Sequence, residues 1–462
     1  MSVKTTMLSG KRVSVIGLAR EGTDLARFLV GEGARVLVND MRPPEVLADR
    51  LAELDGLPIQ FELGGHPFEP VLDTDLLFVS PGVPPELPLL VEARSRGIPI
   101  SSGTRLFFER CPAPIIGITG SSGKTTTTTL TGQIFQQAGR QTIVGGNIGV
   151  PLLGRLGEIG PDAWVILELS SFQLEPMDVS PHIAAITNIT PNHLDRHPSM
   201  EAYTNAKAQI VHHQRHNDWA VLNADDDGSS TLRPQSQIIR FSLTRHVDGA
   251  YLDGDSLVLS RGGRRQVICG RADLRAPGLH NVANVLTACA VASAAGIEVE
   301  AMRAAATAFT GVRHRLELIA EIDGVQYVND SIATAPERSM AGLAVYVDAR
   351  TPVVLLAGGR DKHLPMDEWG RMIAGSARAL VTFGEMAEDV ERAVLKAGLP
   401  ADRVHRAETV DRAVAEARRA AQPGDVVLLS PGGTSYDQYQ DFEERGDHFA
   451  SVVRAARDGG HV

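Results

Sequence analysis

The sequence predicts an α/β fold made of three consecutive domains with mainly parallel sheets. Short apolar runs of buried-strand type recur along the chain, each ending at a glycine or a polar residue, and helical stretches separate them. This alternation is typical of parallel sheets, in which a helix carries the chain from one strand to the next. The length of 462 residues exceeds one compact core and corresponds to about three domains of roughly 150 residues each. We place the domains at residues 1–107, 108–311 and 312–462.

The composition argues against several classes of protein. With 43% hydrophobic and 22% charged residues, the chain resembles an ordinary globular protein rather than a disordered one. Its net charge of -11 argues against general binding to nucleic acids or anionic membranes, which need basic surfaces. Cys111, Cys269 and Cys289 lie far apart, so neither a disulfide framework nor a zinc site is expected, and a cytoplasmic location fits. No apolar run has the length of a signal peptide or a membrane-spanning helix.

The first domain opens with a strand, helix, strand unit. Residues 13–17 and 34–39 are the strands, an amphipathic stretch up to Gly31 joins them, and Asp40 follows the second strand. Such units bind ligands at the carboxyl ends of their strands, where a helix N-terminus receives phosphate. The G-x-G-x-x-G pattern of dinucleotide sites is absent, which favours a mononucleotide site or a plain structural unit over an NAD-dependent oxidoreductase. Further strands are expected at residues 75–79 and 99–103, before a linker at 107–114.

A phosphate-binding loop follows the next strand. Residues 115–119 form a buried strand, the loop Gly120-Ser121-Ser122-Gly123-Lys124-Thr125 comes directly after it, and a Thr-rich helix starts at Thr126. Backbone N–H groups of such a loop bind phosphate oxygens, while Lys124 neutralises charge and the Thr125 hydroxyl can bind magnesium. Gly120 precedes Gly123 by three positions, whereas the usual Walker spacing has five. More strands are expected at residues 164–169, 183–189 and 219–223, a hairpin region at 238–269 and a helix at 280–294.

The third domain begins a new α/β series. Its expected strands end in glycine-rich turns, which is typical of parallel sheets that bind ligands at their carboxyl edge. The strands are expected at residues 325–329, 352–356, 380–383 and 426–429.

The run TGSSGKTTT, residues 119–127, resembles the ATP-binding signature of the Mur ligases and of their relative folylpolyglutamate synthase. The resemblance extends along essentially the whole chain. It implies an ATP-dependent, magnesium-requiring carboxylate–amine ligase with three parts. These would be a Rossmann-like N-terminal domain for a UDP-linked substrate, a central P-loop-type ATPase domain, and a Rossmann-like C-terminal domain for the incoming amino acid.

Three further residues are assigned to the metal site by the resemblance. Glu168, at the end of a strand in LELSSFQL, is on its own as much a structural residue as a magnesium ligand, but the similar family segment carries a metal-binding glutamate. His193 lies in NITPNHLDRH, which is similar to the family motif that supplies a ligand to a second magnesium ion. Lys207 has the composition of an ordinary helix-surface lysine. In the family, a lysine at this place reacts with carbon dioxide to form a carbamate that supports the second magnesium.

The remaining ATP contacts are assigned from further segments that are similar to those of the family. Asn281 and Asn284 in GLHNVAN match a family helix whose asparagines serve the nucleotide, although Asn281 alone would be interpreted as a helix cap. Arg315 in HRLE resembles the arginine that binds the terminal phosphate of ATP, a role that suits its planar, permanently charged group. Asp330 resembles an aspartate that contacts the ribose. Since Arg315 and Asp330 belong to the third domain, catalysis is expected to require domain closure.

The resemblance also assigns the substrate contacts. The UDP-linked substrate is expected at Arg20, Asp40, Arg42, Ser80 and Asn147, and Glu21 stands where many relatives have a small hydroxyl residue. In the branch that adds glutamate, the amino-acid pocket corresponds here to Thr334, Lys362, Ser435 and Phe442.

One departure concerns the choice of amino acid. Ile332 replaces a lysine that the glutamate-adding branch usually carries. The loss of this positive charge beside the pocket makes L-glutamate an alternative, whereas D-glutamate is the usual amino acid of the branch. We expect D-glutamate to be added to UDP-N-acetylmuramoyl-L-alanine through an acyl phosphate, with L-glutamate or a sibling ligase adding another amino acid as alternatives. Folylpolyglutamate synthase usually lacks the first domain. A non-catalytic nucleotide-binding regulator would be expected to have lost Glu168, His193 or Lys207. We also expect the protein to be a cytoplasmic monomer that binds neither nucleic acid nor membrane.

Overall fold

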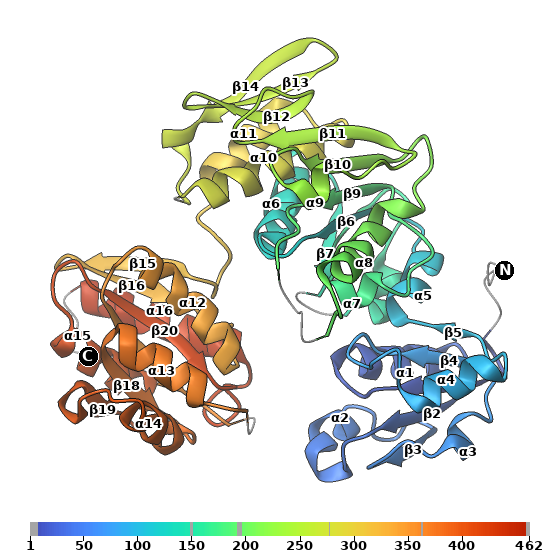
Figure 1. Ribbon diagram of the computed structural model, residues 1–462, viewed down its shortest axis with the longest axis horizontal. Coiled ribbons are helices and arrows are strands. Elements are labelled where there is room, and N and C mark those ends of the chain that lie inside the picture. Colours follow the sequence, from blue (N-terminus) through green and yellow to red (C-terminus); the bar gives the residue numbers. More distant parts are fainter. Residues whose placement is uncertain (1–7, 148–150, 192–195, 277, 362–363, 459–462) are drawn as a thin grey trace. The chain divides into compact units, whose positions relative to one another are not determined.

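A computed structural model describes residues 8–147, 151–191, 196–276, 278–361 and 364–458 (Figure 1). The chain divides into two compact units, Met1–Phe309 and Thr310–Val462. The first unit contains two sheets and the second contains one, and most strand pairs in them are parallel. The predicted fold of three α/β domains with mainly parallel sheets is therefore confirmed. No helix within the described ranges has the length and apolar character needed to cross a bilayer.

The N-terminal sheet has five parallel strands in the order β3-β2-β1-β4-β5. Its strands are apolar because both faces are covered. Val13 and Val15 of β1 belong to the core cluster that includes α1, whereas Ile16 packs with Leu89 and Leu90 of α4 on the opposite face. The elements are β1 (Arg12–Ile16), α1 (Arg20–Gly31), β2 (Arg35–Asp40), η1 (Pro44–Leu47), α2 (Ala48–Ala52), β3 (Ile59–Leu63), α3 (Phe68–Val71), β4 (Leu76–Val79), α4 (Pro88–Ser95) and β5 (Ile100–Ser101).

Helix α5 (Gly103–Arg110) occupies part of the segment expected to be a linker. Ser102 caps this helix by accepting a hydrogen bond of 3.1 Å from the backbone N–H of Arg105, and Phe107 is buried in the core. The prediction of a linker from Phe107 is therefore wrong for residues 107–110, because the apolar side chains there pack rather than connect. The exact domain boundaries stay a prediction.

The central sheet has nine strands in the order β14-β13-β12-β11-β10-β9-β6-β8-β7. Strand β6 is entirely buried and pairs in parallel with β8 and β9, while the pairs β12–β13 and β13–β14 are antiparallel, as the expected hairpin region requires. The strands are β6 (Ile115–Thr119), β7 (Thr142–Gly146), β8 (Trp164–Glu168), β9 (Ile183–Ile186), β10 (Trp219–Asn223), β11 (Gln237–Ser242), β12 (Gly249–Asp253), β13 (Ser256–Arg261) and β14 (Arg264–Gly270). The helices are α6 (Lys124–Gln137), η2 (Leu153–Glu158), α7 (Ser171–Leu174), α8 (Met200–His212), α9 (Asp227–Ser230), η3 (Arg271–Asp273), α10 (Leu279–Ala294) and α11 (Val299–Ala308).

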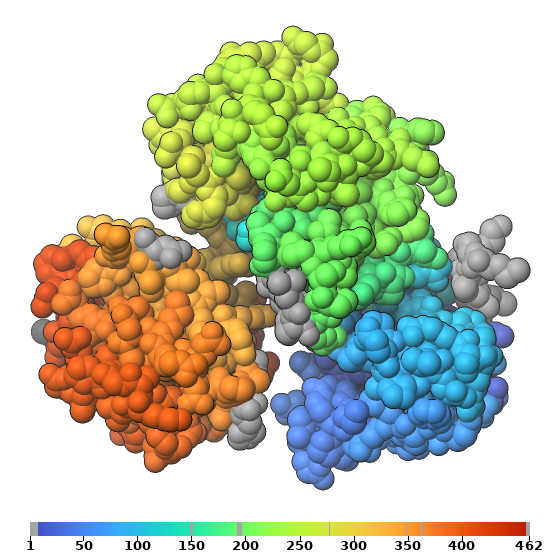
Figure 2. All heavy atoms as spheres, viewed as in Figure 1, coloured from blue at the N-terminus to red at the C-terminus, as the bar shows by residue number. Residues whose placement is uncertain are grey.

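The second unit is a six-stranded sheet in the order β15-β16-β20-β17-β18-β19, covered by helices on both faces (Figure 1). Figure 2 shows the heavy atoms in the same view, with this unit in orange to red. One core cluster contains Val410 of α15 and Phe449 of α16, and another contains Leu343 of α12 and Trp369 of α13, which shows that the helices divide between the two faces. Only β15 runs antiparallel to its neighbour. The elements are β15 (Glu317–Ile322), β16 (Val325–Asn329), α12 (Pro336–Asp348), β17 (Val353–Gly358), α13 (Asp367–Ser376), β18 (Ala377–Phe383), α14 (Ala387–Lys396), η4 (Ala401–Arg403), β19 (Val404–Arg406), α15 (Val410–Ala420), β20 (Val426–Gly432) and α16 (Phe442–Arg457).

Candidate active site

The phosphate loop connects β6 to α6 at the carboxyl edge of the central sheet. The helix begins at Lys124, two residues earlier than expected, because Gly123 caps it in the left-handed conformation with φ of 77°. A Cβ atom on Gly120 would lie 1.8 Å from the hydroxyl oxygen of Thr187, so the adjacent strand end leaves no room for a side chain. Asn188 fastens the loop from the same side, since its side-chain and backbone oxygens accept hydrogen bonds from the N–H groups of Ser122 (3.0 Å) and Ser121 (2.9 Å).

Lys124 and Asn284 both lie against this loop. The Lys124 ammonium group donates to the backbone oxygens of Gly120 (2.8 Å) and Ser121 (3.1 Å), which keeps its charge beside the loop. Asn284 of α10 is buried, and its amide oxygen would lie 2.3 Å from a Cβ on Gly123. Since α10 packs against α6, the segment that carries Asn281 and Asn284 forms a wall of the loop. Their predicted nucleotide contacts, like that of Thr126, remain predictions.

The first residues of the expected metal site are in contact with one another. The Thr125 hydroxyl donates a hydrogen bond of 2.7 Å to Oε2 of Glu168, and the Asn147 amide donates one of 2.8 Å to Oε1. Asn147 also donates its backbone N–H to the backbone oxygen of Glu168 at 2.9 Å. Glu168 is 2% exposed at the end of β8. Both oxygens of this buried side chain accept hydrogen bonds from neutral donors, and the oxygen atoms of Thr125 and Glu168 are ligands of the kind that magnesium prefers.

Lys207 is buried rather than exposed, in contrast to what its composition alone suggested. Its ammonium nitrogen donates to the Gly120 backbone oxygen at 2.8 Å and lies 4.7 Å from the centre of the Tyr203 ring. Burial, and to a lesser degree the charge of Lys124, lower the pKa of Lys207 to about 7, against the opposing effect of Glu168. A large fraction of this amine is therefore neutral near pH 7, which is the form that can react as a nucleophile.

Four of the five residues expected to bind the UDP-linked substrate lie at the ends of strands of the N-terminal sheet or in the loops or helices that follow them, and the fifth, Asn147, follows β7 of the central sheet. Asp40 accepts a hydrogen bond of 2.7 Å from the backbone N–H of Leu18 and is held by the Arg42 guanidinium at 2.8 and 2.9 Å. Burial alone would raise the pKa of Asp40, but these hydrogen bonds outweigh it and hold the pKa below its usual value. The Ser80 hydroxyl donates to the Gly17 backbone oxygen at 2.7 Å, and Arg20 donates to the Asn147 backbone oxygen at 3.2 Å.

Asp330 lies at the end of β16 in the second unit and is buried. Its carboxylate accepts hydrogen bonds from the Ser430 hydroxyl (2.8 Å) and from the backbone N–H of Leu316 (3.3 Å), the residue after Arg315. Burial raises the pKa of Asp330 to about 7, although the Ser430 hydrogen bond and the charge of Arg315 oppose that rise. His314 and Leu316 have φ angles of 61° and 45°, so the backbone on both sides of Arg315 is held in the left-handed region.

The expected amino-acid pocket is organised by Arg445, which has no exposed surface. Its guanidinium donates to the Ser331 hydroxyl (3.0 Å) and backbone oxygen (2.9 Å) and to the Gly433 backbone oxygen (3.2 Å). It therefore ties together the two turns that lead to Thr334 and to Ser435. Ser331 also donates to the Phe442 backbone oxygen at 2.8 Å. One hydrogen-bonded cluster therefore includes the backbone of Phe442 and the turns just before Thr334 and Ser435.

Sequence comparison decides the family. Family models match three consecutive regions: a Mur ligase MurD-like N-terminal domain at residues 11–102, a Mur ligase middle domain at 118–292, and a Mur ligase glutamate ligase domain at 314–433. A protein named UDP-N-acetylmuramoylalanine–D-glutamate ligase, from Symbiobacterium thermophilum, is 44% identical over 450 residues, which is 96% of this chain and 98% of that protein. The chain belongs to the Mur ligase family.

Other Mur ligases support the same assignment. A protein of the same name from Pelotomaculum thermopropionicum is 40% identical over 97% of this chain and 98% of its own length. The fold is similar to that of the crystal structure of UDP-N-acetylmuramate–alanine ligase from Thermotoga maritima, with a TM-score of 0.54 and 20% identity over 96% of this chain and 100% of that one. At that identity the structural likeness shows the Mur ligase fold alone.

Not every residue predicted for a Mur ligase site can be placed. His193 and Lys362 lie outside the described residues. Conversely, neither the Arg445 cluster nor the contact between Glu21 and Gln173 is indicated by any pattern in the sequence. The run Ser170 to Gln173 does have the S-x-x-Q spacing of a capping box, which could have identified the start of α7.

Proposed function

We propose that this protein joins D-glutamate to UDP-N-acetylmuramoyl-L-alanine at the expense of ATP, a step in the synthesis of peptidoglycan precursors. The observation that carries the proposal is the alignment of relatives named UDP-N-acetylmuramoylalanine–D-glutamate ligase along 96–97% of this chain. The geometry of the phosphate loop and of Glu168 supports it, because a carboxylate ligase needs both a phosphate-binding loop and a place for a divalent cation.

The chemistry proceeds in two steps. The alanyl carboxylate attacks the terminal phosphorus of ATP, which gives an acyl phosphate and ADP. The glutamate amine then attacks the acyl carbon, an amide bond forms, and phosphate leaves with the bonding electrons of the broken C–O bond. Lys124 and the N–H groups of residues 120–126 offset the negative charge of the transferring group, as does Arg315. No side chain of the protein has to act as the nucleophile.

Two magnesium ions complete the proposed centre. Bound magnesium would neutralise charge on the transferring phosphoryl group and polarise it. Thr125 and Glu168 would hold the first ion, and His193 with a carbamate on Lys207 would hold the second. The carbamate forms when the neutral Lys207 amine attacks carbon dioxide and loses a proton, and the depressed pKa of Lys207, about 7, supports this step.

The remaining ligand assignments rest on the family motifs and on the clusters described above. The nucleotide would contact Asn281, Asn284 and Asp330. The UDP-linked substrate would be held by Arg20, Asp40, Arg42, Ser80 and Asn147, and glutamate by Thr334, Lys362, Ser435 and Phe442. Hydroxyl and ammonium donors suit a free dicarboxylic amino acid, since both of its carboxylates need donors.

The deciding experiment measures phosphate release from ATP with magnesium and UDP-N-acetylmuramoyl-L-alanine, in the presence of D-glutamate, L-glutamate or another amino acid. Release that depends on D-glutamate, and that Glu168→Gln abolishes, is the expected result. Release with L-glutamate alone would overturn the stereochemical assignment, and release with another amino acid alone would identify a sibling ligase.

We further propose that the enzyme works in the cytoplasm as a monomer. Its UDP-linked substrate and ATP are cytoplasmic molecules, and the three widely spaced cysteines fit a reducing compartment. A net charge of -11 opposes self-association. Light scattering of the purified protein should give the mass of one chain, 49.5 kDa, and a mass of twice that value would contradict the proposal.

A further inference from the structure

Two adjacent residues of α1 reach from the N-terminal sheet to the segments around Glu168. Arg20 donates to the backbone oxygen of Asn147 at 3.2 Å, and Asn147 is hydrogen-bonded to both the backbone and the carboxylate of Glu168. Glu21, the next residue, accepts a hydrogen bond of 2.8 Å from the Gln173 amide. Gln173 lies five positions after Glu168 in sequence. The end of β8 is therefore held from two sides by one helical turn.

The amide of Gln173 has only one possible orientation. Its oxygen accepts hydrogen bonds from the backbone N–H of Ser170 (2.9 Å) and from the Ser170 hydroxyl (3.1 Å), so its nitrogen must point to Glu21. The Ser170 hydroxyl in turn accepts from the backbone N–H of Gln173 at 3.2 Å, which completes a capping box at the start of α7. Glu21 thus fixes the one side chain that closes the turn directly after Glu168.

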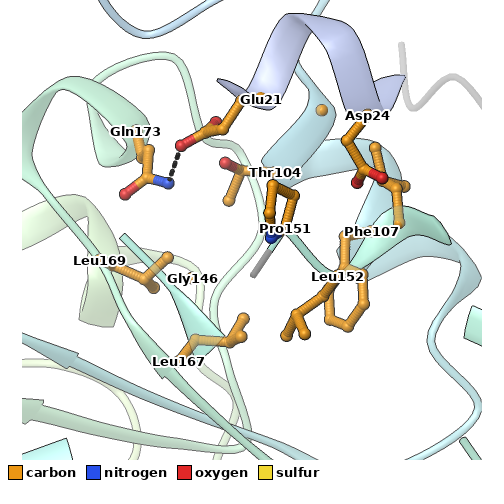
Figure 3. A pocket seen from close by; sticks show the side chains of 12 residues that line it. Glu21, Asp24, Thr104, Phe107, Gly146, Pro151, Leu152, Leu167, Leu169 and Gln173 are labelled. Carbon is orange, nitrogen blue, oxygen red and sulfur yellow. Dashed lines mark hydrogen bonds between the residues drawn. The ribbon is translucent and has the colours of Figure 1, made fainter. Parts of the chain in front are cut away.

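Figure 3 shows the surroundings of this contact. Glu21 and Asp24 lie on the same side of a cavity of about 50 Å³, and Gln173 approaches Glu21 from the other side. The other walls are largely apolar and include Phe107, Leu152 and Leu167. Burial raises the pKa of Glu21 to about 7, against the lowering effects of Arg20 and of the Gln173 hydrogen bond, and Asp24 adds to the rise. Burying a carboxyl group among apolar side chains costs folding free energy, and the hydrogen bond with Gln173 offsets part of that cost.

We propose that Glu21 is a positioning residue for the metal site: by holding Gln173 it fixes the segment from Glu168 to Leu174, and with it the carboxylate that binds magnesium. The inference rests on the proposed function and names a residue that acts on its site from the N-terminal sheet. A serine or threonine at this position would be too short to make the same contact from the same backbone. The reach of a glutamate side chain is what connects α1 to α7.

The test compares variants of Glu21 with matched variants of Asp24 and Gln173 in the full-length protein. The affinity for Mn²⁺ is measured from the electron paramagnetic resonance signal of the free ion, in the presence of a non-hydrolysable ATP analogue and without substrate. Glu21→Ala is expected to weaken Mn²⁺ binding about tenfold, as removal of a residue that orients a metal ligand does. Glu21→Gln keeps an acceptor for Gln173 and should restore the affinity to within about twofold of wild type.

Asp24→Ala is the control, because Asp24 lies on the same helix and cavity wall but accepts from the backbone N–H of Gly154 at 3.4 Å instead of contacting α7. Its Mn²⁺ affinity should equal that of wild type. Gln173→Ala should reproduce the loss, and the double variant with Glu21→Ala should lose no more than either single variant. If Glu21→Ala does not fold, Gln173→Ala and Glu21→Gln carry the comparison.

Equal Mn²⁺ affinity in wild type, Glu21→Ala and Gln173→Ala would overturn the proposal. So would an equal loss in Asp24→Ala, since that would reflect the cavity as a whole. Because Mn²⁺ binding is measured without amino acid or UDP-linked substrate, it can succeed or fail independently of the ligation assay that tests the proposed function.

Discussion

The Thr125 hydroxyl donates a hydrogen bond of 2.7 Å to the Glu168 carboxylate, although the two residues are 43 positions apart in sequence. Thr125 lies in the first turn of α6, and Glu168 ends β8, the strand beside β6 in the sheet. Two adjacent parallel strands therefore place a hydroxyl and a carboxylate in contact at one edge, beside a phosphate loop.

Replacing Thr125 by alanine should raise the magnesium concentration needed for half-maximal activity about 10- to 100-fold, because one oxygen donor and the hydrogen bond that orients Glu168 are both lost. Thr125→Ser keeps the hydroxyl and should recover most of the activity. Thr129→Ala, one turn later on α6, is the matched control and should behave as wild type. Rates of phosphate release at a series of magnesium concentrations give the answer, and an unchanged magnesium requirement in Thr125→Ala would remove Thr125 from the metal site.

Lys207 should carry a carbamate that requires its neutral amine. Since its pKa is about 7, the amine becomes protonated as the pH falls below that value, and carbamate formation is then lost. Carbon-13 NMR of the protein in labelled bicarbonate should show one carbamate signal at pH 8 that weakens by pH 6. Lys207→Arg should lack this signal and lose about 100-fold in activity. A signal that persists in Lys207→Arg would place the carbamate on another lysine.

Arg445→Lys should weaken glutamate binding and destabilise the second unit. One ammonium group cannot replace the fork that reaches Ser331 and Gly433 together, so we expect a loss of about 2–4 kcal/mol in the free energy of unfolding. The KM for glutamate should rise while the KM for ATP stays constant. Arg454→Lys, an exposed position on the same helix, serves as the control. Equal glutamate KM values for Arg445→Lys and wild type would show that the cluster does not shape the pocket.

Asp330 should make the second unit less stable as the pH rises. Its pKa is about 7 in the folded protein and 3.8 is its ordinary value, so between these values the folded state retains a proton that the unfolded state has released. The free energy of unfolding therefore falls as the pH increases through this window, by about 2–4 kcal/mol. Asp330→Asn removes this contribution. Denaturant unfolding of both proteins from pH 4 to pH 8 measures it, and parallel pH profiles would mean that Asp330 is ionised throughout.

Thr128→Val should stabilise the first unit. The Thr128 hydroxyl is buried on α6 and has no hydrogen-bond partner among the described atoms. Valine has the same shape and the same branching at Cβ, so the substitution removes only the cost of an unsatisfied polar group, about 1 kcal/mol. Thermal unfolding should show a higher midpoint than wild type. A lower midpoint would show that the hydroxyl does have a partner in solution.

The sheets were predictable where apolar runs were long and bounded by glycine. Strands β6, β10 and β16 were predicted with their exact residues, since each is a short apolar segment followed by a turn. Strand β3 was missed because all of its residues are partly or fully exposed, and β7 because a Gly-Gly pair ends it. The end of α5, residues 107–110, is not predicted as helix, since the amphipathic pattern of this helix is only two turns long.

Side-chain environments were less predictable than elements. The family motif singles out Lys207, but its burial is not evident from the sequence, because burial depends on the packing of α8 against β6 and β9. The burial of Arg445 cannot be predicted from the sequence pattern, since an arginine in a polar run is normally exposed. The contact between Glu21 and Gln173 joins residues 152 positions apart, which no local pattern can indicate.

The packing of Asn284 against the phosphate loop also governs when the loop can work during synthesis. Asn284 contacts Thr127 across 157 positions of the chain, so a growing polypeptide contains the whole loop long before it contains the helix that supports it. Protein chains emerge from the ribosome with their N-terminal parts first, and a nascent chain shorter than about 284 residues lacks that wall. We therefore expect nucleotide affinity to arise abruptly and late in translation.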